Sequence, residues 1–253
     1  MVLEKDIELK RDDITLSGML FVPERDDKNP AVIIAHGLPS TPLPVQEKGY
    51  DELGRKICAL GAVSIIFNFS GCQGSGGYFS LKNWVNDLDL VSNYIWNLEV
   101  VDPIKVAFLA FSMGTIPTIY YVAHQAQNGE KQTKFLIICA CPATLSDKRL
   151  AELRLGIHLT KDAGGIRIEK EYDKEIISDF KEHLPINWID HISSPKFILH
   201  GARDDLVNVK NAHALYEKAQ EPKELMILEK AGHKLRQDEI AMARILELIK
   251  KSM

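Results

Sequence analysis

The sequence predicts an α/β fold in which a mostly parallel, eight-stranded sheet carries helices on both faces. Short apolar runs such as residues 31–35 and 62–69 are typical of strands that are buried on both sides. Between these runs, apolar residues recur at helical spacing, and strands that alternate with helices favour parallel pairing. The chain has 253 residues, of which 45% are hydrophobic and 26% are charged, so it is long enough for one large domain of this class.

The first strands are expected to form an antiparallel hairpin. Residues 7–9 and 14–22 are rich in apolar side chains and are separated by the polar turn Arg11-Asp12-Asp13. The buried strand 31–35 then ends at His36-Gly37, and a helix with its apolar stripe from Tyr50 to Leu60 follows.

A glycine-rich loop, residues 70–77, follows the strand at 62–69. It lacks the Lys-Ser/Thr ending of a P-loop, and its glycine spacing does not fit G-x-G-x-x-G, so nucleotide binding is not expected. A clear amphipathic stripe comes next and predicts a helix. Its members are Trp84, Leu88, Val91, Ile95 and Leu98.

The pattern of strand and helix breaks between residues 145 and 191. This segment is rich in charge and has only short apolar patches, so we expect a small inserted cap of short helices or a hairpin. The core domain is then formed by residues 1–144 and 192–253. Strands are expected at 135–139, 197–201 and 225–228, with helices at 208–219 and at the end of the chain.

The run at residues 106–111 ends abruptly in Ser112-Met113-Gly114, and a helix is expected from 115 to 125. A buried strand that turns sharply into a helix with a serine at the turn is the pattern of a nucleophile elbow. The residues two before and two after the serine must be small, which Ala110 and Gly114 satisfy. The other interpretation is a serine that caps the helix.

A serine hydroxyl needs a base within reach and a third group that orients the base. In a parallel sheet, such groups are expected just beyond the carboxyl ends of the strands. The strand at 197–201 leads into Asp204 and Asp205, and the strand at 225–228 leads into His233. The chain order serine, aspartate, histidine is that of the α/β-hydrolases.

Five motifs, each at an expected strand end, make the chain resemble the α/β-hydrolase superfamily over nearly its whole length. They are His36-Gly37, the loop Ser70-Gly71-Cys72-Gln73-Gly74-Ser75, Ala110-x-Ser112-x-Gly114, Gly201-x-x-Asp204-x-x-Val207 and Gly232-His233. Within the superfamily, the chain looks most like feruloyl or cinnamoyl esterase-type carboxylesterases and serine-aminopeptidase-like hydrolases.

The resemblance implies a role for each matched residue. Ser112 would be the nucleophile, His233 the general base and then the acid, and Asp204 the group that orients the imidazole. Asp205 competes with Asp204, which keeps the family's motif spacing. The backbone N–H groups of Leu38 and Met113 would form the oxyanion hole. His36 and His200, each at a strand end before a glycine, are interpreted as structural.

These roles imply a serine-dependent acyl hydrolase that acts on small or medium acyl or aryl esters. A peptidase or thioesterase with the same machinery is the alternative. A non-catalytic ligand-binding protein on the same fold is disfavoured, because no member of the triad is missing. The natural substrate, the cap residues that line the pocket and the oligomeric state, a homodimer included, stay open.

Composition and charge exclude several other classes of protein. The net charge is -4 and no basic run occurs, so a nucleic-acid partner is not expected. No apolar run approaches the roughly 20 residues that span a bilayer, and no secretory signal is recognised, so we expect no membrane partner and a cytoplasmic location. The histidines of the cap show no metal-ligand spacing, and neither a metal nor a cofactor is expected. The expected partner is a small-molecule ester or acyl substrate.

Overall fold

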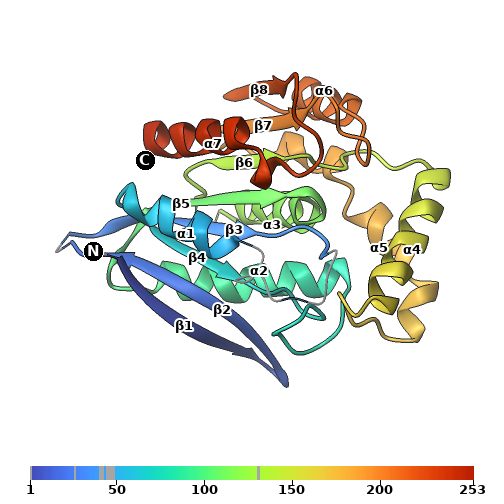
Figure 1. Ribbon diagram of the computed structural model, residues 1–253, viewed down its shortest axis with the longest axis horizontal. Helices are drawn as coiled ribbons and strands as arrows, with labels where there is room; N and C mark the ends of the chain where they lie inside the picture. Colours follow the sequence, from blue (N-terminus) through green and yellow to red (C-terminus); the bar gives the residue numbers. More distant parts are fainter. Residues whose placement is uncertain (1, 26, 40–42, 44–48, 130–131) are drawn as a thin grey trace.

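One eight-stranded sheet organises the computed structural model, which describes residues 2–25, 27–39, 43, 49–129 and 132–253 (Figure 1). The strands are β1 (Val2–Arg11), β2 (Ile14–Pro23), β3 (Asn29–Ala35), β4 (Val63–Phe67), β5 (Val101–Phe111), β6 (Leu136–Cys139), β7 (Lys196–Gly201) and β8 (Lys223–Leu228). Their spatial order is β1-β2-β4-β3-β5-β6-β7-β8. Only the pairs β1–β2 and β2–β4 are antiparallel, which confirms the predicted mostly parallel sheet.

The central strands are buried on both faces, as their continuous apolar runs predict. Ile33 of β3 pairs with Ile65 of β4 on one side and with Phe108 of β5 on the other, and all three side chains are inaccessible to solvent. Pairing in this register brings the ends of β3 and β5 together, because Ala35 lies opposite Ala110. The residues that follow these two strands are therefore neighbours.

Helices cover both faces of the sheet (Figure 1). On one face, α2 (Leu81–Trp96), α3 (Thr115–Asn128) and α6 (Lys210–Lys218) contribute to one hydrophobic cluster. On the other face, α1 (Tyr50–Ala59) and α7 (Glu239–Ser252) contribute to a second cluster. Two cores separated by one sheet are the arrangement that the alternation of strands and helices predicts.

The helices of residues 145–191 lie beyond the carboxyl ends of the strands (Figure 1), and the first of them, with 16 residues, is longer than the short helices expected from the sequence. They include α4 (Asp147–Asp162) and α5 (Ile176–Glu182). The middle of this cap is tied to the glycine-rich loop by an isolated antiparallel bridge between Cys72 and Ile166. The Arg167 N–H donates to the Gly71 carbonyl at 2.7 Å, and the Arg167 carbonyl accepts from the Phe79 N–H at 2.8 Å.

None of the helices in the described part of the chain combines the length and the apolar character that a membrane crossing requires.

Candidate active site

Ser112 stands at the turn between β5 and α3, and its backbone is strained. Its φ is +48°, in the left-handed region that residues with a side chain rarely adopt. Such a conformation costs about 1–3 kcal/mol and persists only where the surroundings enforce it. Gly114 shows how tight these surroundings are, because a Cβ atom built there would lie 2.2 Å from the carbonyl oxygen of His36. The turn therefore has the geometry expected of a nucleophile elbow.

His233 and Asp204 complete a hydrogen-bonded chain that starts at Ser112. The distance from Ser112 Oγ to His233 Nε2 is 2.8 Å, and that from His233 Nδ1 to Asp204 Oδ2 is also 2.8 Å. A carboxylate oxygen only accepts, so the Nδ1–H donates to Asp204 and Nε2 keeps a lone pair for the serine proton. The three residues follow the carboxyl ends of β5, β7 and β8, and in a parallel sheet these ends all lie on the same side. The arrangement can activate a serine hydroxyl.

Asp204 is held by donors on both of its oxygen atoms. Oδ1 accepts from the N–H groups of Leu206 at 3.0 Å and Val207 at 2.8 Å. Burial alone would raise the pKa of the Asp204 carboxyl group, but hydrogen bonds from His200, His233 and Val207 outweigh burial and lower this pKa well below its ordinary value. The side chain is therefore a carboxylate at neutral pH.

The structure distinguishes between the two neighbouring aspartates. Asp204 faces His233, whereas Asp205 is exposed and lines an open hollow of about 460 Å³ beside the histidine. The remaining residues that line this hollow are Leu206, Gly232, His233, Lys234, Gln237 and Asp238.

The backbone segments that carry the predicted oxyanion residues pass close to Ser112. Gly37, which precedes Leu38, is so close that a Cβ atom built on it would lie 3.0 Å from Ser112 Cβ. Met113 follows Ser112 in the short 3-10 turn Ser112–Gly114 that leads into α3. The first N–H groups of a helix carry partial positive charge and suit an anion. A backbone that must pass the serine this closely explains a glycine at position 37.

His36 holds the loop that carries Leu38. Its Nε2 accepts from the Phe69 N–H at 3.1 Å, which leaves Nδ1–H to donate to the Gly37 carbonyl at 2.7 Å. Both ring nitrogens are thus used by the backbone, in line with the structural role expected for this residue. His200 also bonds to backbone, through the Val207 carbonyl at 2.8 Å. It lies 3.2 Å from Asp204 Oδ2 as well, a contact that the sequence analysis missed.

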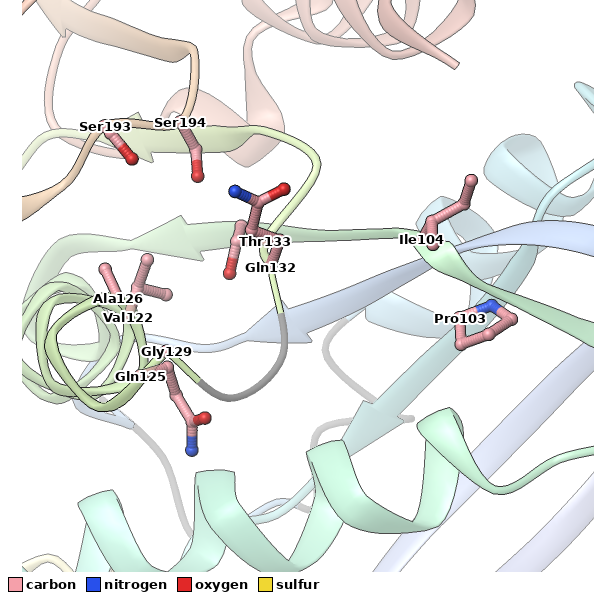
Figure 2. A pocket seen from close by; sticks show the side chains of 10 residues that line it. All are labelled: Pro103, Ile104, Val122, Gln125, Ala126, Gly129, Gln132, Thr133, Ser193 and Ser194. Carbon is pink, nitrogen blue, oxygen red and sulfur yellow. The ribbon is translucent and has the colours of Figure 1, made fainter.

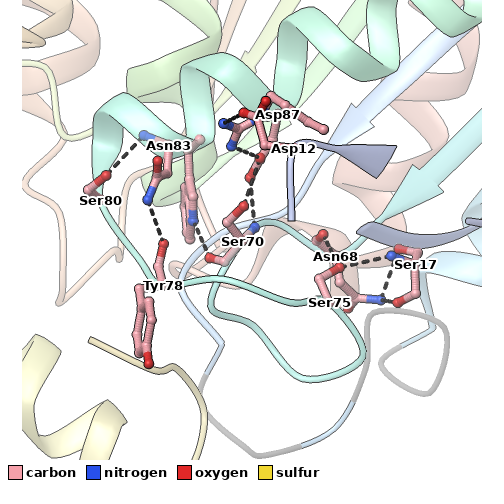
Figure 3. A network of polar contacts seen from close by, with 11 residues as sticks. Asp12, Ser17, Asn68, Ser70, Ser75, Tyr78, Ser80, Asn83 and Asp87 are labelled. Carbon is pink, nitrogen blue, oxygen red and sulfur yellow. Dashed lines mark hydrogen bonds and ion pairs between the residues drawn. The ribbon is translucent and has the colours of Figure 1, made fainter. Parts of the chain in front are cut away.

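The glycine-rich loop after β4 is fixed by a buried carboxylate (Figure 3). Asp87 of α2 accepts from the Ser70 N–H and from Ser70 Oγ, each at 2.7 Å. Arg11 of β1 donates to Asp87 Oδ1 at 3.1 Å. The sequence analysis contained no signal for the Arg11–Asp87 pair, because the two residues are far apart in the chain. The loop is thus a support for the site and does not display a phosphate-binding lysine.

Neither a reactive thiol nor a cluster of metal ligands is found among the described residues. Burial raises the pKa of the Cys141 thiol to about 12, so this cysteine is not a ready thiolate. Within the described ranges, no three His, Cys, Asp or Glu side chains gather in a way that would hold a metal ion.

A second hollow lies at the opposite edge of the sheet, near the amino ends of β6 and β7 (Figure 2). The residues lining it are Pro103, Ile104, Val122, Gln125, Ala126, Gly129, Gln132, Thr133, Ser193 and Ser194. None of these side chains is an acid, a base or a cation, and the hollow is remote from Ser112.

Comparison with known proteins bears on the fold of the chain. No protein-family model matches the chain. It is 25% identical over 167 residues to alpha/beta hydrolase domain-containing protein 17B of Xenopus laevis, a match over 66% of this chain and 49% of the relative. The alignment thus spans about half the length of this curated relative.

Solved structures match over almost the whole chain. The Pyrococcus furiosus esterase Pf2001 superposes with a TM-score of 0.72 and 21% identity, over 99% of this chain and 91% of the esterase. Est1E from Butyrivibrio proteoclasticus, solved with ferulic acid bound, gives a TM-score of 0.73 and 18% identity, over 97% and 96% of the two chains. The chain therefore has the α/β-hydrolase fold, and it resembles esterases of that fold.

Proposed function

We propose that the protein is a serine hydrolase that cleaves carboxylic esters with small or medium acyl or aryl groups. The observation that carries the proposal is the unbroken chain of two 2.8 Å contacts from Ser112 through His233 to Asp204, with the serine on a strained turn. Likeness to esterases of the same fold supports the reaction class, and the ferulic acid bound to Est1E supports an ester with an aromatic acyl group as a candidate substrate.

In the proposed reaction, Ser112 Oγ attacks the ester carbonyl carbon while His233 Nε2 takes the hydroxyl proton. The N–H groups of Leu38 and Met113 would stabilise the oxyanion that forms, and one such donor typically contributes about 2.7–4 kcal/mol. The protonated His233 then gives its proton to the leaving alcohol, and the acyl group stays on Ser112. Water, deprotonated by His233, releases the acid and restores the serine.

Asp204 has two functions in this cycle. It fixes the tautomer of His233 that has its lone pair on Nε2, and its negative charge stabilises the imidazolium that forms in each half-reaction. Donors on both of its oxygens prevent the carboxylate from turning away. A positioned base of this kind typically accelerates a reaction by about 10²–10⁴-fold.

The test is hydrolysis of p-nitrophenyl acetate and butyrate by the wild-type protein and by Ser112→Ala. We expect turnover that disappears in the variant, and labelling of the wild type by a fluorophosphonate that the variant does not show. Ser178→Ala, which changes an exposed serine of α5, is the control and should keep both activity and labelling. Hydrolysis that survives in Ser112→Ala would contradict the proposal.

The same assay separates the alternatives. A peptidase or a thioesterase would be labelled at Ser112 but would prefer aminoacyl amides or acyl thioesters to matched esters. A ligand-binding protein would show neither turnover nor labelling.

All four cysteines are buried free thiols, which supports a further proposal that the protein works in the reducing cytoplasm. Its substrate there would be a small-molecule ester.

A further inference from the structure

His200 lies at the end of β7 and is completely buried. Its Nε2 is 2.8 Å from the Val207 carbonyl oxygen and 3.2 Å from Asp204 Oδ2. A carbonyl and a carboxylate both accept, so Nε2 must carry the hydrogen and share it between the two oxygens. Nδ1 is buried and has no hydrogen-bond partner among the described residues.

One oxygen of Asp204 therefore has two imidazole donors. Oδ2 accepts from His233 Nδ1 at 2.8 Å and also faces His200 Nε2. His233 belongs to the proposed reaction, whereas His200 is sealed behind the carboxylate and cannot reach a substrate. At His36, the other strand-end histidine before a glycine, each ring nitrogen has a backbone partner.

We infer that His200 is a positioning residue that fixes the Asp204 carboxylate and reduces the negative charge that Oδ2 presents to His233. This inference rests on the proposed function, in which His233 is the base. A donor on Oδ2 stabilises the carboxylate and competes with His233 for its charge. Because Nε2 also binds the Val207 carbonyl, the ring links the turn 204–207 to the end of β7. The lowered pKa of Asp204, to which His200 contributes, is consistent with this contact.

The inference predicts the effect of removing the donor. In His200→Leu the Asp204 carboxylate keeps His233 as its one imidazole partner. It then attracts a proton on the His233 ring more strongly, and it is less firmly oriented. In His200→Gln the side-chain amide offers an N–H close to the position of Nε2. We expect His200→Leu to lose about 10-fold in kcat/KM at pH 7 and to move the acid limb of the pH profile to higher pH. His200→Gln should restore most of both.

The experiment combines this pH profile with NMR titration of histidine ring signals in uniformly labelled protein. His233→Gln assigns the His233 signal. The expected result is a titration midpoint of His233 that rises in His200→Leu and returns toward the wild-type value in His200→Gln. Equal midpoints in the wild type and His200→Leu, with both proteins folded by circular dichroism, would overturn the inference. A midpoint that rises equally in both variants would also overturn it, because a donor at Nε2 would then be irrelevant.

The NMR readout needs no turnover, so it separates this inference from the proposed function. A protein that hydrolyses no ester but shows the expected His233 shifts would refute the function and keep the positioning role. Should His200→Leu fail to fold, the Nε2–H signal of His200 in the wild type is compared with that in Asp204→Asn. Loss of the charged acceptor should move this signal upfield, and an unchanged signal would overturn the inference.

Discussion

Replacing Asp204 with asparagine removes one negative charge and keeps the shape of the side chain. The structure determines how the new amide must sit. Oδ1 accepts two backbone N–H groups, at 2.8 and 3.0 Å, so an NH₂ group placed there would face two donors. Backbone N–H groups cannot give up their hydrogens, so the amide oxygen stays at the Oδ1 position. The NH₂ group takes the place of Oδ2, facing His233 and also His200, whose ring hydrogen is then left to the Val207 carbonyl.

This placement reverses the tautomer of His233. Nδ1 must now accept a hydrogen from the amide, so Nε2 carries the remaining ring hydrogen and cannot take the proton of Ser112, 2.8 Å away. A wrong tautomer in a serine triad costs about 10⁴-fold in kcat. We expect kcat/KM for p-nitrophenyl butyrate to fall by about 10³–10⁴-fold, which is about 4–5.5 kcal/mol of transition-state stabilisation.

The control is Asp205→Asn, the same change one residue along at an exposed position. Its kcat/KM should stay within about 2-fold of the wild type, since surface substitutions away from special contacts have small effects. The assignment of the acid would be refuted if kcat/KM fell by less than 10-fold in Asp204→Asn. It would also be refuted if kcat/KM fell further in Asp205→Asn than in Asp204→Asn.

The same substitution also changes acid stability. Because the folded protein lowers the pKa of Asp204, the carboxylate stabilises the native state above the pKa of an unfolded aspartate, about 3.9, and this stabilisation is lost as the pH falls below that value. The free-energy advantage of the wild type over Asp204→Asn in urea unfolding should therefore shrink as the pH falls below about 3.9.

Three further comparisons of variants test the support of the site through the free energy of unfolding. Gly114→Ala places a Cβ 2.2 Å from a backbone oxygen and should lower this free energy by about 3 kcal/mol, whereas Gly156→Ala, with open space around it in α4, should raise it by about 0.5–1 kcal/mol. Ser112→Gly should be about 1 kcal/mol more stable than Ser112→Ala, because glycine adopts a φ of +48° without strain; equal stabilities would show that the turn is not strained. Arg11→Met leaves the buried Asp87 without its cation and should cost about 2 kcal/mol in chemical denaturation, and a change below about 0.5 kcal/mol would contradict the role of the pair.

The parts of the site that lie in local motifs could be predicted from the sequence. The serine turn is encoded by an apolar strand, two small residues and a helix, all within a short stretch around Ser112. Gly232-His233 and Asp204 follow apolar strands, and parallel strands bring their carboxyl ends to one edge. The order of the helices and strands followed from the alternation of continuous apolar runs with apolar residues at helical spacing.

Contacts between distant segments could not be predicted in this way. Motif spacing favoured Asp204 over Asp205, and in the structure Asp204 is the one of the two that contacts His233. The bridge between Cys72 and Ile166 joins segments that share no pattern. The contact of His200 with Asp204 depends on how residues 204–207 turn back toward the end of β7, which the sequence pattern does not reveal.

The bridge at Cys72 has a consequence for engineering the cap. It divides the insertion into two halves that share an anchored rung, residues 166–167. Each half of the insertion is therefore attached to the core at both of its ends. A chimera that keeps this rung and exchanges one half at a time would preserve the attachment to the core, whereas transplanting the whole cap would have to rebuild it.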